Sequence, residues 1–166
     1  MKLLIKPWRS KMVERIHVLA KLLIDGDLKI SIAESCTGGA LASTLTSVSG
    51  ASSYFDRGYV AYSNEAKVDM LKVNPQTINS KGAVSEEVAL EMVKGVVSES
   101  VSDVAVAITG IAGPTGGTKE KPIGTVCFGF SIKNRLSTST QSFQGSREEI
   151  VNQSVGFALN HLISSI

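Results

Sequence analysis

Short apolar stretches alternate with amphipathic helical patterns along most of this chain. Apolar side chains recur at helical spacing at Met12, Ile16, Leu19 and Leu23, and the strand-like stretch 28–33 follows directly. Alternating strands and helices are typical of a parallel sheet that helices cover on both faces. We therefore expect an α/β fold, a three-layer α/β/α sandwich with a mixed, mostly parallel sheet of about five strands.

The last third of the chain departs from this alternation. Residues 123–132 and 136–143 are two strand-like segments that 133–135 join, which predicts an antiparallel hairpin. Ser146 and Glu149 then have the spacing of a capping box, which predicts the start of a final helix. The expected sheet therefore contains one antiparallel strand.

Length and composition favour a single domain. The chain has 166 residues, and its 17 basic and 15 acidic side chains are spread along it without a basic block. Nucleic acid is therefore not expected as a partner. Cys36 and Cys127 have no metal-ligand spacing, and no segment approaches the length of a membrane span. We expect a cytoplasmic protein with no metal, cofactor or membrane partner, in which 1–11 is an N-terminal extension and 12–166 is the domain.

Polar or glycine-rich segments follow three of the expected strands, where α/β sheets bind ligands. These segments are 34–39, 63–67 and 109–118. In the second segment Asn64 is the expected cap of a helix that ends before Pro75. The third segment is glycine-rich, and we expect it to contact phosphate or ribose through residues such as Gly113.

The turn after the first strand combines hydroxyls, a thiol and two glycines. Its residues are Glu34, Ser35, Cys36, Thr37, Gly38 and Gly39. Free backbone N–H groups and the positive end of a helix dipole favour an anion at such a turn. The turn also contains two candidate nucleophiles, Ser35 and Cys36. We expect it to hold the substrate, with Glu34 either contacting a ribose hydroxyl or a site cation, or pairing with Lys67.

Several long motifs resemble one family. The chain reads AESCTGG at 33–39, YSNEAK at 62–67, GAVSEEVA at 82–89, TGIAGPTGGTKEKPIGTV at 109–126 and QGSRE at 144–148. In this order they resemble the CinA C-terminal domain family, the nicotinamide mononucleotide amidohydrolases. The chain is similar to the stand-alone form of that family, and the resemblance implies a homodimer.

The resemblance also implies a reaction and the residues that perform it. The implied reaction hydrolyses the carboxamide of nicotinamide mononucleotide to nicotinic acid mononucleotide and ammonia, in pyridine nucleotide recycling. By motif position, Ser52 is the nucleophile and Lys67 the general base, with Tyr62 beside it. Thr109 and Arg147 match further site positions.

This chemistry is reasonable for these residue types. Serine needs a base to remove its proton as it attacks an amide, and lysine is a base only when it is neutral. Desolvation or a nearby cation such as Arg147 would lower the pKa of Lys67. Backbone N–H groups near Gly38 or Gly110 are candidate donors to the oxyanion.

One geometric condition accompanies the assignment of Ser52. A fully extended chain would separate Ser52 from Tyr62 by about 33 Å. They can meet only if residues 50–57 fold back, or if the second subunit of a dimer supplies one of them.

Two rival hypotheses remain open from the sequence. The chain could be a noncatalytic nucleotide-binding module linked to competence or DNA metabolism. Alternatively, it could be a hydrolase that uses Ser35 or Cys36 as its nucleophile.

Overall fold

The fold is a central sheet between two layers of helices. We describe it from a computed structural model, in which residues 7–166 are described and side chains from residue 11 onward. In chain order the elements are α1 (Pro7–Asp25), β1 (Ile30–Glu34), α2 (Ala40–Leu45), the 3-10 turn η1 (Ala51–Ser53), β2 (Phe55–Val60), α3 (Asn64–Leu71), α4 (Pro75–Lys81), α5 (Glu86–Ser98), β3 (Val104–Gly110), β4 (Thr125–Ile132), β5 (Arg135–Ser142) and α6 (Arg147–Ser165).

The five strands lie in the order β2-β1-β3-β4-β5. β1 pairs in parallel with both β2 and β3, whereas β4 is antiparallel to both β3 and β5. Only β4 therefore runs against the other four strands, which confirms the mixed sheet with one antiparallel member. Because β1, β2 and β3 are parallel, their carboxyl ends lie at one edge of the sheet.

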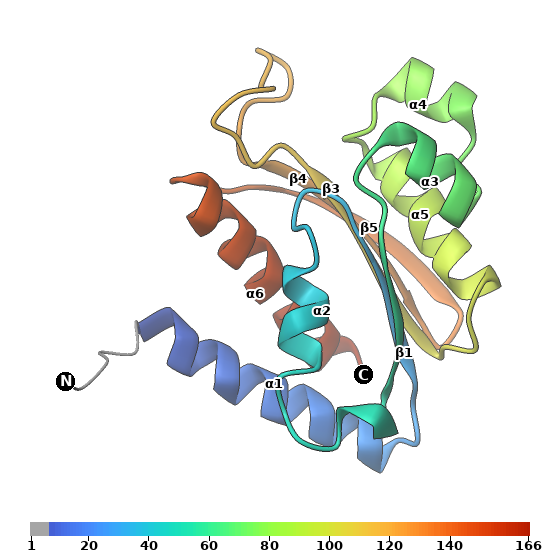
Figure 1. The fold of residues 1–166 in the computed structure, drawn as a ribbon, viewed down its shortest axis with the longest axis vertical. Coiled ribbons are helices and arrows are strands. Elements are labelled where there is room, and N and C mark those ends of the chain that lie inside the picture. The colour runs from blue at the N-terminus through green and yellow to red at the C-terminus, as the bar shows by residue number, and fades with distance from the viewer. Residues whose placement is uncertain (1–6) are drawn as a thin grey trace.

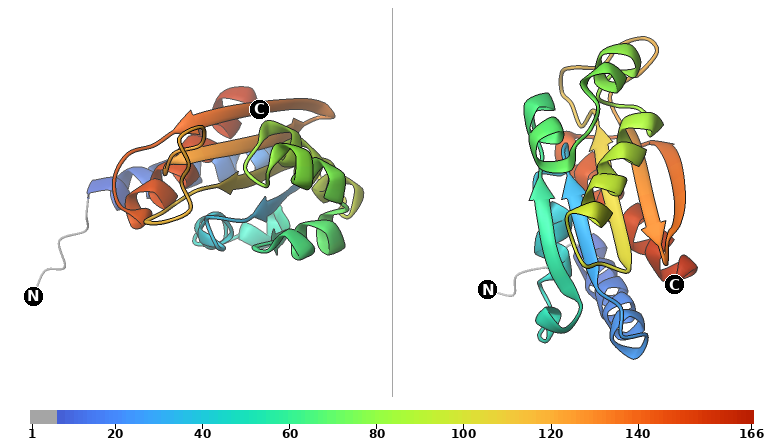
Figure 2. Two further views of the ribbon diagram at one scale, coloured as in Figure 1. Left: turned by 90° about the horizontal axis from the view of Figure 1, so that it is seen from above. Right: turned by 90° about the vertical axis from the view of Figure 1, so that its right-hand side faces the viewer.

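Figure 1 shows the helices on the two faces of the sheet, with α1, α2 and α6 on one side and α3, α4 and α5 on the other. The views in Figure 2 agree with this arrangement. Two separate hydrophobic clusters lie between the sheet and the two helical layers. The structure therefore confirms the three-layer α/β/α sandwich.

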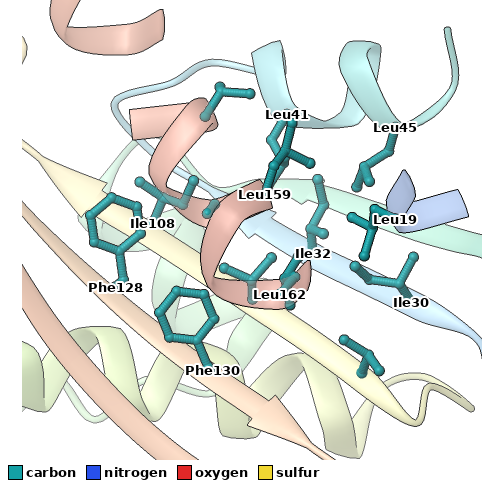
Figure 3. Packing of buried hydrophobic residues seen from close by; sticks show 14 of the residues in the cluster. Leu19, Ile30, Ile32, Leu41, Leu45, Ile108, Phe128, Phe130, Leu159 and Leu162 are labelled. Atoms are coloured by element: carbon teal, nitrogen blue, oxygen red, sulfur yellow. The ribbon is translucent and has the colours of Figure 1, made fainter. Parts of the chain in front are cut away.

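The larger cluster packs the even-numbered side chains of β1 against α2 and α6. Ile30, Ile32 and Leu41 are fully buried there. Phe128 of β4 and the α6 side chains Leu159 and Leu162 close the layer (Figure 3). Strand side chains alternate between the two faces of the sheet. Ala33 therefore belongs to the second cluster, on the face that α5 covers. This alternation directs Glu34 toward α2 and Ser35 toward the layer of α3 and α5.

The helix boundaries confirm some expectations and correct others. Both halves of the capping box at Ser146 and Glu149 are present. The cap of α3 is Ser63, whose side chain accepts from Ala66 N–H, so Asn64 is the first helical residue instead. Pro75 does not merely end a helix: it begins α4, because its fixed φ suits a first helical turn. Among the residues that the structure describes, no helix is long and apolar enough to cross a membrane.

Candidate active site

The candidate site lies where β1, β2 and β3 end. Ser35 follows β1, Tyr62 lies two residues beyond β2, and the glycine-rich loop follows β3. The Ser35 N–H donates to the carbonyl of Ile108 at 2.9 Å, and the Ala61 N–H donates to that of Glu34 at 2.9 Å. These bonds extend the sheet pairing past the strand ends and hold the three segments together.

Lys67 is a buried titratable group of this site. It lies one turn into α3 and is only 2% exposed. Its ammonium nitrogen donates to the Ser35 hydroxyl at 3.0 Å and to the Ala61 carbonyl at 3.2 Å. It also lies 3.3 Å from the Tyr62 carbonyl and 3.4 Å from the Ser63 carbonyl. Its neighbours are therefore neutral oxygens, and one of them is a serine hydroxyl.

Burial lowers the pKa of Lys67, because the charged form loses the solvation that water would provide. Within the described residues no carboxylate forms an ion pair with this lysine to restore the charged form. A lysine with a lowered pKa next to a hydroxyl has the arrangement of a general base and its nucleophile.

Glu34 has a different role from those expected of it. Its two carboxylate oxygens accept from the N–H groups of Leu41 at 2.9 Å and Ala42 at 2.8 Å. The side chain is fully buried and caps α2, so it does not pair with Lys67. Because this carboxylate already occupies the start of α2, that helix end is closed to an anionic ligand.

Arg147 connects two segments at the rim of the site. It is the first residue of α6, where a cation opposes the helix dipole. Its guanidinium donates to the Gly113 carbonyl at 2.8 Å and to the Tyr62 hydroxyl at 2.8 Å. The Tyr62 side chain is 58% exposed, so its ring faces solvent beside the buried pair.

Thr109 and Gly110 support the site from the end of β3. The buried Thr109 hydroxyl donates to the Ala83 carbonyl at 2.8 Å, which fixes the segment before α5 against the sheet. A Cβ atom at Gly110 would lie 3.0 Å from the Cys36 sulfur. A glycine is therefore needed for β3 to approach the turn after β1.

The thiol of Cys36 is poorly suited to act as a nucleophile. Burial raises its pKa to about 12, and the Glu34 charge adds to the effect. Thiolate is the nucleophilic form, so this thiol is inert near neutral pH. Cys127 is buried within β4, and burial raises its pKa as well.

The structure does not bring Ser52 to Lys67 within one chain. Ser52 lies exposed in η1, and the neighbouring Tyr54 carbonyl accepts from the N–H of Ile30, at the start of β1. Ser52 therefore lies at the amino ends of β1 and β2, whereas Lys67 lies beyond their carboxyl ends. The six residues of β2 span about 20 Å. Residues 55–60 are extended, so the first of the two conditions for the Ser52 assignment, a fold-back of residues 50–57, is not met. Only a second subunit could place Ser52 beside this lysine.

The pairing of Ser35 with Lys67 was not selected from the sequence, although both residues were candidates. The available signal was positional, since each follows one of two strands that the structure shows to be adjacent and parallel. The turn after Ser35 contains Gly38 and Gly39, both with positive φ, and Gly38 is exposed. These glycines let the chain reverse into α2 beside the pair.

Comparison with protein families gives one match that covers most of the chain. The model of the CinA C-terminal domain matches residues 13–166. The nicotinamide-nucleotide amidohydrolase PncC of Enterobacter agglomerans is 50% identical over 131 residues, which are 78% of this chain and 80% of that protein. A CinA-like protein of Chlorobium limicola is 52% identical over 80% of this chain but only 32% of its own length. The chain spans about a third of the length of several of the curated relatives that it matches.

Solved structures show the same fold. The competence/damage inducible protein CihA of Agrobacterium tumefaciens aligns with a TM-score of 0.91 at 38% identity, covering 99% of this chain and 98% of that one. A CinA superfamily protein of Escherichia coli aligns with a TM-score of 0.91 at 34% identity, covering 100% and 96%.

Proposed function

This chain belongs to the CinA C-terminal domain family, and on that premise we propose that it hydrolyses the carboxamide of nicotinamide mononucleotide. The products are nicotinic acid mononucleotide and ammonia. The relative named nicotinamide-nucleotide amidohydrolase supports this substrate, since it is 50% identical over most of both chains. We assign the nucleophile to Ser35 and the general base to Lys67.

The contact between these two side chains carries the proposal. The Lys67 nitrogen lies 3.0 Å from the Ser35 hydroxyl, within the reach that proton transfer requires. Burial lowers the pKa of the lysine, which increases the fraction of the neutral base at any pH below 10.5. Among the side chains that the structure describes, from residue 11 onward, none is a base hydrogen-bonded to Ser52.

The first half of the reaction forms an ester on Ser35. The serine oxygen attacks the carboxamide carbon while its proton passes to the neutral Lys67 amine. The resulting tetrahedral intermediate carries an oxyanion, which nearby hydrogen-bond donors stabilise. The C–N bond then breaks, Lys67 returns the proton to the leaving nitrogen, and ammonia departs.

The second half hydrolyses the ester. A water molecule attacks the acyl carbon as Lys67 accepts one of its protons. Collapse of the second tetrahedral intermediate breaks the bond to the Ser35 oxygen, which regains its proton from Lys67. The net reaction consumes one water and yields one carboxylic acid and one ammonia.

Residues at the rim hold the nucleotide in this proposal. Arg147 uses one N–H on Gly113 and one on Tyr62, and its remaining donors are suited to a phosphate oxygen. The exposed Tyr62 ring offers a flat apolar surface to the pyridinium ring beside Ser35. Gly113 and Gly38 supply backbone that a ligand can approach closely.

Incubation of the purified protein with nicotinamide mononucleotide tests the proposed activity. We expect ammonia and nicotinic acid mononucleotide to appear in equal amounts. Binding of the nucleotide by folded protein without ammonia release would instead support a noncatalytic nucleotide-binding module. Nicotinamide riboside, which lacks the phosphate, is the matched substrate control and should be hydrolysed less efficiently.

A further inference from the structure

We propose that the side-chain hydroxyl of Thr37 is a catalytic donor to the oxyanion of the tetrahedral intermediate, together with the backbone N–H groups of Cys36 and Thr37. This inference rests on the proposed amidase function and adds a group that stabilises its transition state. The argument begins with a hydroxyl that the fold buries and leaves unpaired.

Thr37 is 5% exposed, and its hydroxyl oxygen has no hydrogen-bond partner in the part of the chain that the structure describes. Among the described residues it is the one buried side-chain oxygen or nitrogen atom in this condition. A buried hydroxyl without a partner destabilises the fold, because the group has lost its bonds to water. A threonine in this state is better explained by a ligand that completes its bonding than by a role in folding.

The unpaired hydroxyl belongs to the turn that carries the nucleophile. The Gly38 N–H donates to the Ser35 carbonyl at 3.0 Å, which closes a tight turn around Cys36 and Thr37. This turn holds Thr37 close to the backbone of Ser35. The Ala40 N–H in turn donates to the Thr37 carbonyl at 3.0 Å, so the backbone of this residue is anchored on its carbonyl side.

The same turn has unused backbone donors. Within the described residues, the N–H groups of Cys36 and Thr37 donate to no carbonyl or carboxylate of the protein. The N–H of the residue that follows a serine nucleophile is a recurring oxyanion donor where a strand ends in a sharp turn. Ser35 directly follows β1, and the bond from the Gly38 N–H to its carbonyl closes such a turn.

The nearby ionisable side chains, Glu34 and Lys67, form hydrogen bonds with other groups and do not occupy these donors. Both oxygens of the Glu34 carboxylate are occupied by the N–H groups of Leu41 and Ala42. The Lys67 ammonium bonds to Ser35 and to backbone carbonyls of residues 61–63. With those groups engaged elsewhere, the Thr37 hydroxyl and the N–H groups of Cys36 and Thr37 remain as donors of this turn for the negative charge that develops on the carboxamide oxygen.

The test compares Thr37→Val, Thr37→Ser and wild type for hydrolysis of nicotinamide mononucleotide and for thermal unfolding without ligand. Valine has nearly the shape of threonine and lacks the hydroxyl, whereas serine keeps it. Thr109→Val is the matched control for stability, because the equally buried Thr109 hydroxyl donates to the Ala83 carbonyl.

We expect Thr37→Val to lower kcat about 100-fold with little change in KM, the effect of removing one oxyanion donor. Thr37→Ser should recover most of the rate. The Tm of Thr37→Val should equal or exceed that of wild type, whereas Thr109→Val should lower it by about 2–4 °C.

Two results would overturn the assignment of Thr37 while leaving the amidase intact. One is a kcat for Thr37→Val within twofold of an active wild type. The other is a Tm as low as that of Thr109→Val, which would show that the hydroxyl has a structural partner. If wild-type protein releases no ammonia, the proposed function itself fails, and this inference fails with it.

Discussion

The Lys67 nitrogen and the Ser35 hydroxyl lie 3.0 Å apart, although 32 positions separate the two residues in the chain. They meet because β1 and β2 are adjacent and parallel, so the segments that follow them share one edge of the sheet. The first turn of α3 then directs Lys67 back over the end of β1. The arrangement depends on the strand order and explains how a lysine becomes buried beside a serine.

The activity should rise with pH. Only neutral Lys67 can accept the Ser35 proton, and burial lowers its pKa from 10.5, the ordinary lysine value. We expect kcat/KM to increase with pH, with the midpoint of the increase below pH 10.5, and to level off above that midpoint. Initial rates of ammonia release, measured between pH 6 and 10 in buffers of constant ionic strength, check this. A rate that falls across that range would contradict a lysine base.

The same lysine links stability to pH. In the unfolded chain Lys67 keeps its proton up to about pH 10.5, whereas the folded chain releases it earlier. Between the two pKa values the unfolded state binds more protons, so stability should rise with pH over that window. Urea unfolding at several pH values measures this slope. Lys67→Met should lack its contribution, and an unchanged slope in that variant would contradict the lowered pKa.

Glu34 should matter for stability. Glu34→Gln replaces one acceptor oxygen with an NH₂ group, so one of the two N–H groups at the start of α2 loses its bond. The loss of a buried, charge-assisted bond costs about 2 kcal/mol in the free energy of unfolding. Urea denaturation measures it, with Glu91→Gln as control, because Glu91 makes a similar bond to the Asn74 N–H at a more exposed position. A loss no larger than that of the control would argue against the cap.

Arg147 should govern substrate binding. Arg147→Met removes the guanidinium that bonds to Tyr62 and Gly113 and that we assign to the phosphate. We expect KM for nicotinamide mononucleotide to rise about 10-fold or more, since a charge-assisted bond contributes about 1.5–3 kcal/mol. Steady-state kinetics check this against Arg57→Met, which removes a guanidinium bound to Asp56 on β2. Equal KM values in the two variants would remove Arg147 from the binding site.

A double-mutant cycle tests whether Tyr62 and Arg147 act together. Tyr62→Phe keeps the ring but removes the hydroxyl that accepts from Arg147 at 2.8 Å. We expect the effects of Tyr62→Phe and Arg147→Met on kcat/KM to be non-additive by about 0.5–1.5 kcal/mol, as for residues in contact. Strictly additive effects would mean that the contact does not contribute to function.

Local patterns were sufficient to predict most of the architecture. The hairpin and the capping box at Ser146 and Glu149 depend on residues close together in the chain, and both are present. The role of Pro75 was missed because a proline both ends one helix and suits the first turn of another. Elements that residues close together in the chain determine could therefore be predicted, except where one residue type suits two positions.

The site was harder to predict because its contacts are not local. Lys67 and Arg147 were identified as site residues by motif, but the partner of Lys67 depends on which strands are neighbours. Ser52 was assigned by motif position, and it could reach Lys67 within one chain only if residues 50–57 folded back, whereas β2 extends through Phe55–Val60. Glu34 could not be recognised as a cap, since its bonds to α2 depend on which face of β1 it occupies.

The most direct test of the central claim compares Ser35→Ala with Ser52→Ala in the hydrolysis of nicotinamide mononucleotide. Both changes remove only a hydroxyl, and circular dichroism confirms that each variant is folded. We predict that Ser35→Ala lowers kcat by at least about 1,000-fold, as expected for a nucleophile, whereas Ser52→Ala stays within about threefold of wild type. Full activity in Ser35→Ala together with loss in Ser52→Ala would contradict the account and assign the nucleophile to Ser52 of a second subunit.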